Sequence, residues 1–387
     1  MGGAETFVRG LIRHAPPDFD VELVGVASEG RARGAEEAEE AGRRYRFRPV
    51  IRVADESRRG AVPLSLRYTL ALWPVRRRWG GPVLFFNRIE PLVAFRHMPG
   101  PKLVAIHNDI SRQIAGGPGE VAWSRFPGLY FAMEARCLPA ADLVLSESRA
   151  TVEECRRRYP ALRDRIEWLP TWFDSDLFFP SREGRAEEKR RLASRHPALR
   201  AEDEWILFAG RYQPQKAPIR LIEAFDRVLR RRSGARLLLS GEGPLKEAMV
   251  RAVSERGLQS RVVFLDSLRR PELGAWHRAA DAFLLGSDYE GMPIGVLEAM
   301  ACGLPVASTP VGEVPSLVTA GVTGEIAAEC SAPALADALE RLLANRGQYS
   351  AADCAAAVAA FAPGAVLGPL YGRIRRLADQ GGGETTR

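Results

Sequence analysis

The hydrophobic positions of the chain fall into short continuous runs, separated by longer segments with helical composition. In the first part of the chain these runs predict strands, at 21–26, 82–86, 102–106 and 142–146. The segments 65–79 and 123–138 are predicted to be helices. Strands that are apolar at nearly every position are typical of parallel sheets covered by helices on both faces.

The same rhythm restarts after residue 200. Further strands are predicted at 205–209, 236–240, 262–265 and 282–285. Helices are predicted at 184–195, 219–232, 331–343 and 351–378. Ligands of such open sheets bind beyond the carboxyl ends of the strands, so a cleft between two such domains is the expected site.

Length and composition fit two globular domains: 387 residues, 46% hydrophobic and 27% charged. The sequence shows no apolar run long enough to span a membrane and no secretory signal, and its five cysteines sit singly, without a CxxC pair. We therefore expect a cytoplasmic protein with reduced thiols. The net charge of +7 is spread evenly, which favours an anionic ligand or membrane surface over a nucleic-acid partner.

Two glutamates eight residues apart, Glu290 and Glu298, carry the strongest chemical signal. Pro293 between them suits the start of a helix, which places Glu290 in a loop and Glu298 one turn inside the helix. The positive end of that helix favours an anion, and the two carboxylates can hold sugar and ribose hydroxyls. The competing interpretation is one carboxylate that stabilises the helix and one exposed glutamate.

Arg211 and Lys216 lie in a loop that follows one predicted strand and precedes a helix. Two cations at the carboxyl end of a strand can neutralise a diphosphate, although exposed surface charge is the simpler interpretation. Gly241 and Gly243 follow the next strand and let backbone approach a ligand or form a tight turn. They are no dinucleotide fingerprint, because Lys246 stands where a third glycine is needed.

Taken together, these motifs resemble family 4 of the retaining GT-B glycosyltransferases. Glu290 and Glu298 match the glutamate pair of that family, and Arg211 and Lys216 match its diphosphate-binding cations. Residues 311–316, 168–180 and 2–5 match the loop after the next strand, the crossing between domains and the glycine loop near the donor. The chain differs from the family pattern at Glu313, Ser316 and Thr171-Trp172.

The resemblance implies an α/β fold with two Rossmann-like, doubly wound domains facing across a cleft. The expected parts are an acceptor domain at 1–180, whose first strand is missing before the Gly2-Gly3 loop, and a donor domain at 181–355. A last helix and tail, 356–387, would pack back on the first domain. The implied donor is a sugar nucleotide, the implied acceptor a glycan or lipid-linked molecule, and no cofactor is implied.

The resemblance also implies roles for individual residues. Arg211 and Lys216 would stabilise the departing diphosphate, Glu290 would bind the donor sugar, and Glu298 the ribose. His107, which follows a predicted strand, would lie near the reacting sugar, with a loop histidine bonded to backbone as the alternative. Further donor contacts would come from Gly2, Gly3, Gly210, Gly241, Gly243, Gly291, Met292, Pro293 and Ile294.

Two other segments leave alternatives open. Asp174-Ser175-Asp176 has the spacing of a metal-binding Asp-x-Asp, but a short acidic turn is the favoured interpretation, and no metal is predicted. Residues 65–79 mix aromatic residues with arginines, which suits either a peripheral contact with the inner membrane face or a plain surface helix. Alternatives to a transferase are an epimerase or phosphorylase on the same fold, or a non-catalytic binder of nucleotide sugars.

Overall fold

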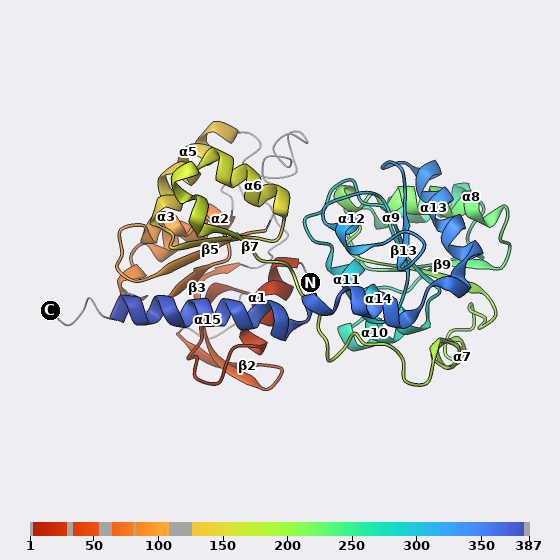
Figure 1. Ribbon diagram of the computed structural model, residues 1–387, viewed down its shortest axis with the longest axis horizontal. Helices are drawn as coiled ribbons and strands as arrows, with labels where there is room; N and C mark the ends of the chain where they lie inside the picture. Colours follow the sequence, from red (N-terminus) through yellow and green to blue (C-terminus); the bar gives the residue numbers. More distant parts are fainter. Residues whose placement is uncertain (1–2, 29–33, 54–63, 80–82, 108–125, 383–387) are drawn as a thin grey trace. The chain divides into compact units, whose positions relative to one another are not determined.

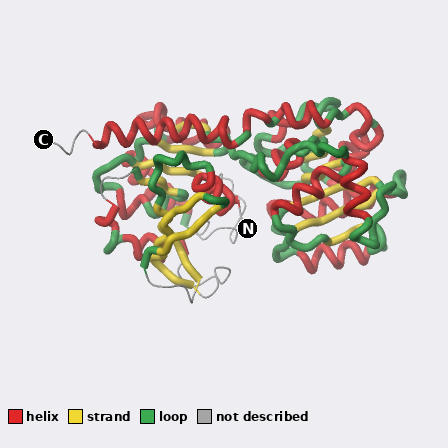
Figure 2. Tube along the Cα trace, turned by 90° about the horizontal axis from the view of Figure 1, so that it is seen from below, coloured by secondary structure: helices red, strands yellow, loops and turns green. Residues whose placement is uncertain are grey.

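The computed structural model describes residues 3–28, 34–53, 64–79, 83–107 and 126–382. The chain divides into two compact units (Figures 1 and 2). Unit 1 contains residues 1–170 and 364–387, and unit 2 contains residues 171–363. The sequence suggested boundaries at 180 and 355 instead.

Unit 1 contains two sheets among its described residues. The order of the first is β1-β3-β2, with β1 and β3 parallel and β2 antiparallel, and the order of the second is β4-β5-β6-β7, all parallel. The strands are β1 (Glu22–Ser28), β2 (Glu36–Glu40), β3 (Arg43–Val53), β4 (Leu84–Phe86), β5 (Lys102–Ile106), β6 (Leu143–Ser146) and β7 (Ile166–Trp168). The strand expected at 21–26 is β1. It pairs with β3, and not with β4. Strand β3 itself was not predicted from the sequence.

The helices of unit 1 lie around these sheets. They are α1 (Gly3–Arg13), α2 (Leu64–Leu72), η1 (Arg76–Trp79), α3 (Leu92–Phe95), α5 (Pro127–Cys137), η3 (Leu138–Ala140), α6 (Arg149–Arg158), η4 (Pro160–Arg165) and α15 (Pro363–Gly382). The single helix expected at 65–79 is wrong: α2 ends at Leu72, because Pro74 disfavours helical backbone before it and offers no N–H. The Gly3-Ala4-Glu5 segment, expected as a loop, begins α1, and Gly2 lies outside the described residues.

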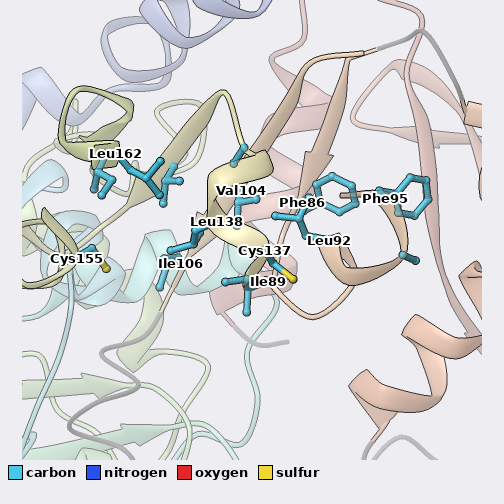
Figure 3. Close-up of a cluster of buried hydrophobic side chains, with 14 of the residues drawn as sticks. Phe86, Ile89, Leu92, Phe95, Val104, Ile106, Cys137, Leu138, Cys155 and Leu162 are labelled. Carbon is cyan, nitrogen blue, oxygen red and sulfur yellow. The ribbon is translucent and has the colours of Figure 1, made fainter. Parts of the chain in front are cut away.

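One hydrophobic core holds unit 1 together. It joins residues of β4 and β5, such as Phe86 and Val104, to Leu92 of α3, Cys137 of α5 and Cys155 of α6 (Figure 3). Val24 and Val50 of the other sheet pack against the same cluster. These strands are apolar because helices cover them, as the continuous hydrophobic runs indicated.

Helix α15 is the last element of the chain and returns to unit 1. The Tyr371 hydroxyl donates a hydrogen bond to the Leu11 carbonyl, and the Tyr371 ring meets Phe19 edge-on at 5.3 Å. Arg375 forms a bidentate pair with Asp18, at 2.7 and 3.0 Å. The continuous helix expected over 351–378 is interrupted, since α14 ends at Ala357 and α15 begins at Pro363.

Unit 2 is a doubly wound domain with one six-stranded parallel sheet, in the order β10-β9-β8-β11-β12-β13. Its strands are β8 (Glu204–Ala209), β9 (Ala235–Ser240), β10 (Val262–Phe264), β11 (Ala282–Leu285), β12 (Val306–Ser308) and β13 (Gly324–Ile326). Its helices are α7 (Arg185–Ala193), η5 (Pro214–Lys216), α8 (Pro218–Leu229), α9 (Lys246–Glu255), α10 (Arg270–Ala279), α11 (Ile294–Ala301), α12 (Val314–Leu317), α13 (Ala332–Ala344), η6 (Arg346–Gln348), α14 (Ala351–Ala357) and η7 (Ala359–Phe361).

Two helical layers cover this sheet. Helices α8, α9 and α13 pack together in one layer, and α10, α11 and α14 in the other, with α7 against α10 (Figure 1). The strands between them are completely buried at Ile206, Leu207, Leu238 and Phe283. This arrangement gives the loops at the carboxyl ends of the strands a rigid base.

Candidate functional site

The strand order of unit 2 indicates where a ligand binds. The chain starts near the middle of the sheet at β8, moves outward through β9 and β10, and then returns to β11 on the other side of β8. Open parallel sheets bind ligands beyond the carboxyl ends of their strands, at the point where the strand order reverses. In this unit that point lies between β8 and β11.

The loops that follow β8 and β11 are bonded to each other at this point. The Asp288 amide donates a hydrogen bond to the Gln215 carbonyl at 2.9 Å, and the Gln215 side chain donates one to the Tyr289 carbonyl at 3.0 Å. Lys216 Nζ lies 2.6 Å from Glu290 Oε1. The structure therefore joins two residues that the sequence analysis had singled out from separate motifs.

Glu290 is an almost buried carboxylate with two partners. Only 6% of its side chain is exposed, against 24% for Lys216. Its Oε1 also accepts a hydrogen bond of 2.6 Å from the Ser287 hydroxyl. Fixed in this way, the carboxylate can accept hydrogen bonds from ligand hydroxyls without reorganisation.

Arg211, directly after β8 and Gly210, differs from Lys216 in its surroundings. Its side chain is exposed and forms no ion pair with any residue that the structure describes. An arginine without an internal partner keeps its five N–H donors available for phosphate oxygens.

Helix α11 starts where the sequence predicted. Pro293 is its N-cap, Met292 and Pro293 are buried, and Gly291 and Ile294 are half-buried. The first amides of a helix point out of its N-terminal end and carry a partial positive charge, which suits a phosphate or a sugar hydroxyl.

Glu298 lies inside α11, and 5% of its side chain is exposed. Its Oε1 is 2.8 Å from Nη2 of Arg270, at the start of α10. The pKa of Glu298 is raised to about 7, because burial and the nearby Asp174 raise it by more than Arg270 lowers it. Asp174 thus lies near a residue of the predicted donor motif.

Gly241 and Gly243 lie very close to other backbone. Both have positive φ, at 146° and 153°, and a Cβ on Gly241 would lie 1.9 Å from the Gly210 carbonyl oxygen. A Cβ on Gly243 would lie 2.5 Å from the Tyr212 carbonyl oxygen. The close neighbour of these glycines is therefore the backbone of the loop after β8, which they hold in place.

The loop after β12 supports the Glu290 loop from the other side. Gly312 has a φ of 52°, and a Cβ there would lie 2.3 Å from the Gly291 carbonyl oxygen. The Glu313 amide donates a hydrogen bond of 3.0 Å to the same oxygen. The position of Glu290 thus depends on backbone from β12 as well as β8.

His107 lies in unit 1, at the carboxyl end of β5. Its Nε2 contacts Oδ1 of Asn87, and its Nδ1 lies 3.8 Å from Oε2 of Glu147. The sequence analysis had singled out neither Asn87 nor Glu147. Both directly follow a strand, β4 and β6, so polar residues at the ends of neighbouring strands were the signal that could have found them.

The described residues contain no group of three or more histidine, cysteine, aspartate or glutamate side chains placed to hold a metal ion. Around Asp174-Ser175-Asp176, the Asp176 amide donates a hydrogen bond of 3.2 Å to the Asp174 carboxylate, as in a short acidic turn.

Two family models match the chain. "Glycosyltransferase Family 4" covers residues 1–177 and "Glycosyl transferases group 1" covers residues 189–358. Together with the fold, these matches define the class, and the chain belongs to the group 1 glycosyltransferase family of GT-B proteins.

Curated relatives match about half of the chain. The chain is 32% identical to a GDP-mannose-dependent alpha-(1-6)-phosphatidylinositol monomannoside mannosyltransferase of Mycolicibacterium smegmatis, over 58% of this chain and 59% of that protein. It is 34% identical to a D-inositol 3-phosphate glycosyltransferase of Frankia alni, over 48% of this chain and 46% of that protein. The chain thus spans about half the length of the curated relatives it matches.

Solved structures are similar over nearly the whole length of the chain. Sucrose-phosphate synthase of Thermosynechococcus elongatus matches with a TM-score of 0.75 at 21% identity, over 98% of this chain and 93% of that one. HepE of Anabaena, solved with UDP and glucose, matches with a TM-score of 0.71 at 16% identity, over 97% and 96%. At these identities the likeness establishes the fold, which is the GT-B fold expected from the sequence.

Proposed function

We propose that this protein is a retaining glycosyltransferase that moves a sugar from a nucleoside diphosphate donor to an acceptor hydroxyl. The observation that carries the proposal is the 2.6 Å pair of Lys216 and Glu290 at the strand reversal between β8 and β11. A diphosphate cation and a sugar-binding carboxylate stand there next to the N-terminus of α11. Each group matches one part of a sugar nucleotide.

In this proposal, Arg211 and Lys216 stabilise the charge that develops on the departing diphosphate. Glu290 and the backbone of Gly291 to Ile294 hold the sugar, and Glu298 accepts hydrogen bonds from the ribose. The acceptor hydroxyl attacks from the face of the leaving group and gives its proton to the leaving phosphate, so no carboxylate acts as nucleophile, unlike in retaining glycosidases. His107 acts on the reacting sugar in this proposal.

The test of the donor site is calorimetric titration of the chain with UDP, GDP and ADP, each with and without EDTA. One nucleotide should bind, regardless of EDTA, and Arg211→Ala should weaken it at least about tenfold, because one charge-assisted phosphate contact is lost. Arg230→Ala, another exposed arginine of the same unit, is the matched control and should bind as the parent chain does. No binding of any nucleotide would contradict the proposal.

The first donor to test for turnover is GDP-mannose, because the Mycolicibacterium relative is described as dependent on it. UDP-glucose is the second, since HepE was solved with UDP-glucose. The anomeric configuration of the product, measured by NMR, tests retention. Inversion would overturn the retaining mechanism but not the class of reaction.

The alternatives give different outcomes in the same assays. An epimerase would convert the donor without an acceptor, a phosphorylase would need free phosphate, and a non-catalytic binder would bind the donor without turning it over. Activity that is lost in EDTA and restored by manganese would contradict the metal-independent mechanism.

We also propose that α2 and the turn after it touch an anionic membrane surface. Leu66, Leu70 and Trp73 are 38, 60 and 46% exposed, at helical spacing. Arg67 lies between them, and η1 adds three arginines, one of which stacks on Trp73 at 4.8 Å. Exposed apolar side chains beside arginines suit the interface of an anionic bilayer.

This proposal is tested by co-sedimentation with vesicles of phosphatidylcholine alone and of phosphatidylcholine with phosphatidylglycerol. Binding should need the anionic lipid and should fall in Leu70→Asp, while Val250→Asp, at an exposed apolar residue of α9, leaves it unchanged. Equal binding to both vesicles, or none, would refute the contact. No helix in the described part of the chain has the length and hydropathy that crossing a membrane requires.

A further inference from the structure

Three polar residues lie at the carboxyl edge of the β4-β5-β6-β7 sheet of unit 1. Strands β4, β5 and β6 are neighbours, and Asn87, His107 and Glu147 directly follow them. Ile106 pairs with Ser146, so the next residues, His107 and Glu147, are opposite each other. Side chains at paired positions of parallel strands point to the same face.

The His107 ring is held from three directions. Asn87 Oδ1 contacts Nε2, Glu147 Oε2 lies 3.8 Å from Nδ1, and the Phe7 ring of α1 meets the imidazole edge-on with 4.5 Å between centroids. Only 13% of the histidine side chain remains exposed, and 19% of the Glu147 side chain. These contacts restrict the orientation of the ring.

The two polar partners act differently on the two ring nitrogens. A carboxylate that faces Nδ1 favours the tautomer with its proton on Nδ1. Oδ1 of Asn87 faces Nε2 and accepts a hydrogen bond from a protonated Nε2, and a half-turn of the amide presents the NH2 group instead, so Asn87 can bond to Nε2 with or without a proton there. The imidazole can therefore hold or release a proton at Nε2 while its orientation stays fixed.

We propose that Glu147 and Asn87 are positioning residues for His107, and that Glu147 sets its tautomer. The inference rests on the proposed function for the role of His107 in transfer, but the tautomer itself can be measured without any turnover. Glu147 also has a structural role, since its carbonyl accepts a hydrogen bond of 3.1 Å from Trp168 Nε1. That bond uses the main chain, so a change of the side chain leaves it in place.

The first test is NMR of the full chain labelled with 15N-histidine, with the His107 signals identified by their loss in His107→Gln. At a pH where the imidazole is neutral, Nδ1 should carry most of the proton in the parent chain. Glu147→Gln should shift the share toward Nε2 by several fold. Glu153→Gln, at an exposed glutamate of α6, is the matched control and should leave the His107 signals unchanged.

A His107 tautomer that is the same in Glu147→Gln as in the parent and control chains would overturn the inference. The far-ultraviolet circular dichroism and melting temperature of each variant show whether it is folded. Where Glu147→Gln is not folded, Glu147→Asp is measured in its place, and the shorter carboxylate should give an intermediate share.

The second test is kinetic. Glu147→Gln should lower kcat roughly tenfold to a hundredfold, because a misplaced contact to the reacting sugar can cost about 10²-fold in rate. The donor KM should stay within about twofold, and Glu147→Asp should recover part of kcat. A proportional change of kcat and KM would contradict a positioning role. Absence of turnover in the parent chain would instead count against the proposed function, and the NMR result would still stand.

Discussion

Lys216 and Glu290 are 74 residues apart in sequence and join two loops of unit 2. Removing the cation leaves a carboxylate that is only 6% exposed and whose remaining partner in the described part of the chain is the Ser287 hydroxyl. Lys216→Met should therefore lower the free energy of unfolding by about 1–3 kcal/mol, because a buried charged group loses its partner. Denaturant unfolding measures this loss.

A double-mutant cycle separates the interaction energy between Lys216 and Glu290 from the contribution that each makes with other neighbours. Lys216→Met combined with Glu290→Gln should cost less than the sum of the two single changes, since the neutral amide does not need the cation. Additive effects would show that the two residues contribute to stability independently. Arg211→Ala should leave stability unchanged, because Arg211 is exposed and forms no ion pair among the described residues.

Gly312 tests whether the loop after β12 supports the site. Gly312→Ala combines a positive φ of 52° with a Cβ only 2.3 Å from the Gly291 carbonyl oxygen, so the Glu290 loop must shift. Gly321→Ala is the matched control, since Gly321 has a φ of 76° but nothing within 4 Å of its Cβ. Both variants lose about 1 kcal/mol through left-handed backbone, but only Gly312→Ala should also weaken nucleotide binding, measured by calorimetry.

How far the sequence reveals the site depends on whether a residue acts within a local motif. The sequence could single out Glu290, Glu298, Arg211 and Lys216 because they belong to local motifs, in the loops after β8 and β11 and in α11. The sequence did not reveal that Lys216 pairs with Glu290, nor that Arg270 pairs with Glu298, because these contacts join different strands or helices. Asn87 and Glu147 were missed for the same reason.

Among the elements, α10 carries a buried histidine that titrates far from its usual range. His277 is completely buried between Phe178 and Phe283, and neither ring nitrogen has a hydrogen-bond partner in the described structure. Burial, together with the charges of Arg270 and Arg278, lowers its pKa from 6.5 to about 3. The native state thus keeps the ring neutral while the unfolded chain binds a proton below about pH 6.5.

Because the unfolded chain binds this proton and the native state does not, the free energy of unfolding falls as the pH falls. The stabilising contribution is complete above about pH 6.5 and is lost as the pH falls toward 3, by about 2 kcal/mol at pH 5. His277→Leu removes both the titration and two unpaired nitrogens, so its unfolding free energy should fall less than that of the parent chain between pH 7 and 5. Urea unfolding at both values measures this, with His97→Gln, at an exposed histidine, as control. Equal losses in all three chains would mean that the pKa of His277 is the same in the native and the unfolded state.

Strands that the sequence did not predict show which strands a hydrophobic pattern can reveal. The strands of unit 2 around the site, β8, β9 and β11, agree with prediction to within about one residue because each is a continuous apolar run. Strand β2 has the sequence Glu-Glu-Ala-Glu-Glu and offers no such signal. It forms because three of its glutamates lie opposite arginines of β3, as in the pairs Glu39 with Arg44 and Glu40 with Arg43. That complementarity becomes visible only once the pairing is known.

At the scale of the whole molecule, the chain leaves unit 1 after Pro170, builds unit 2, and returns to unit 1 through α15. The return separates two segments of one unit by the whole of the other. The contacts between α15 and the first part of the chain therefore close a large loop. Because both segments belong to unit 1, we expect the loss of these contacts to lower the stability of unit 1 alone.

Tyr371 is the contact that tests this. It is 6% exposed, bonds to the Leu11 carbonyl and meets the Phe19 ring. Tyr371→Ala should destabilise unit 1 by about 3 kcal/mol, the usual cost of removing a buried aromatic side chain. Hydrogen exchange followed by mass spectrometry should show faster exchange in residues 1–170 and 364–382, with residues 171–363 unchanged. Arg376→Ala, at an exposed position of the same helix, should change neither unit. Loss of protection in both units of Tyr371→Ala would show that they unfold as one, and that α15 stabilises the molecule as a whole.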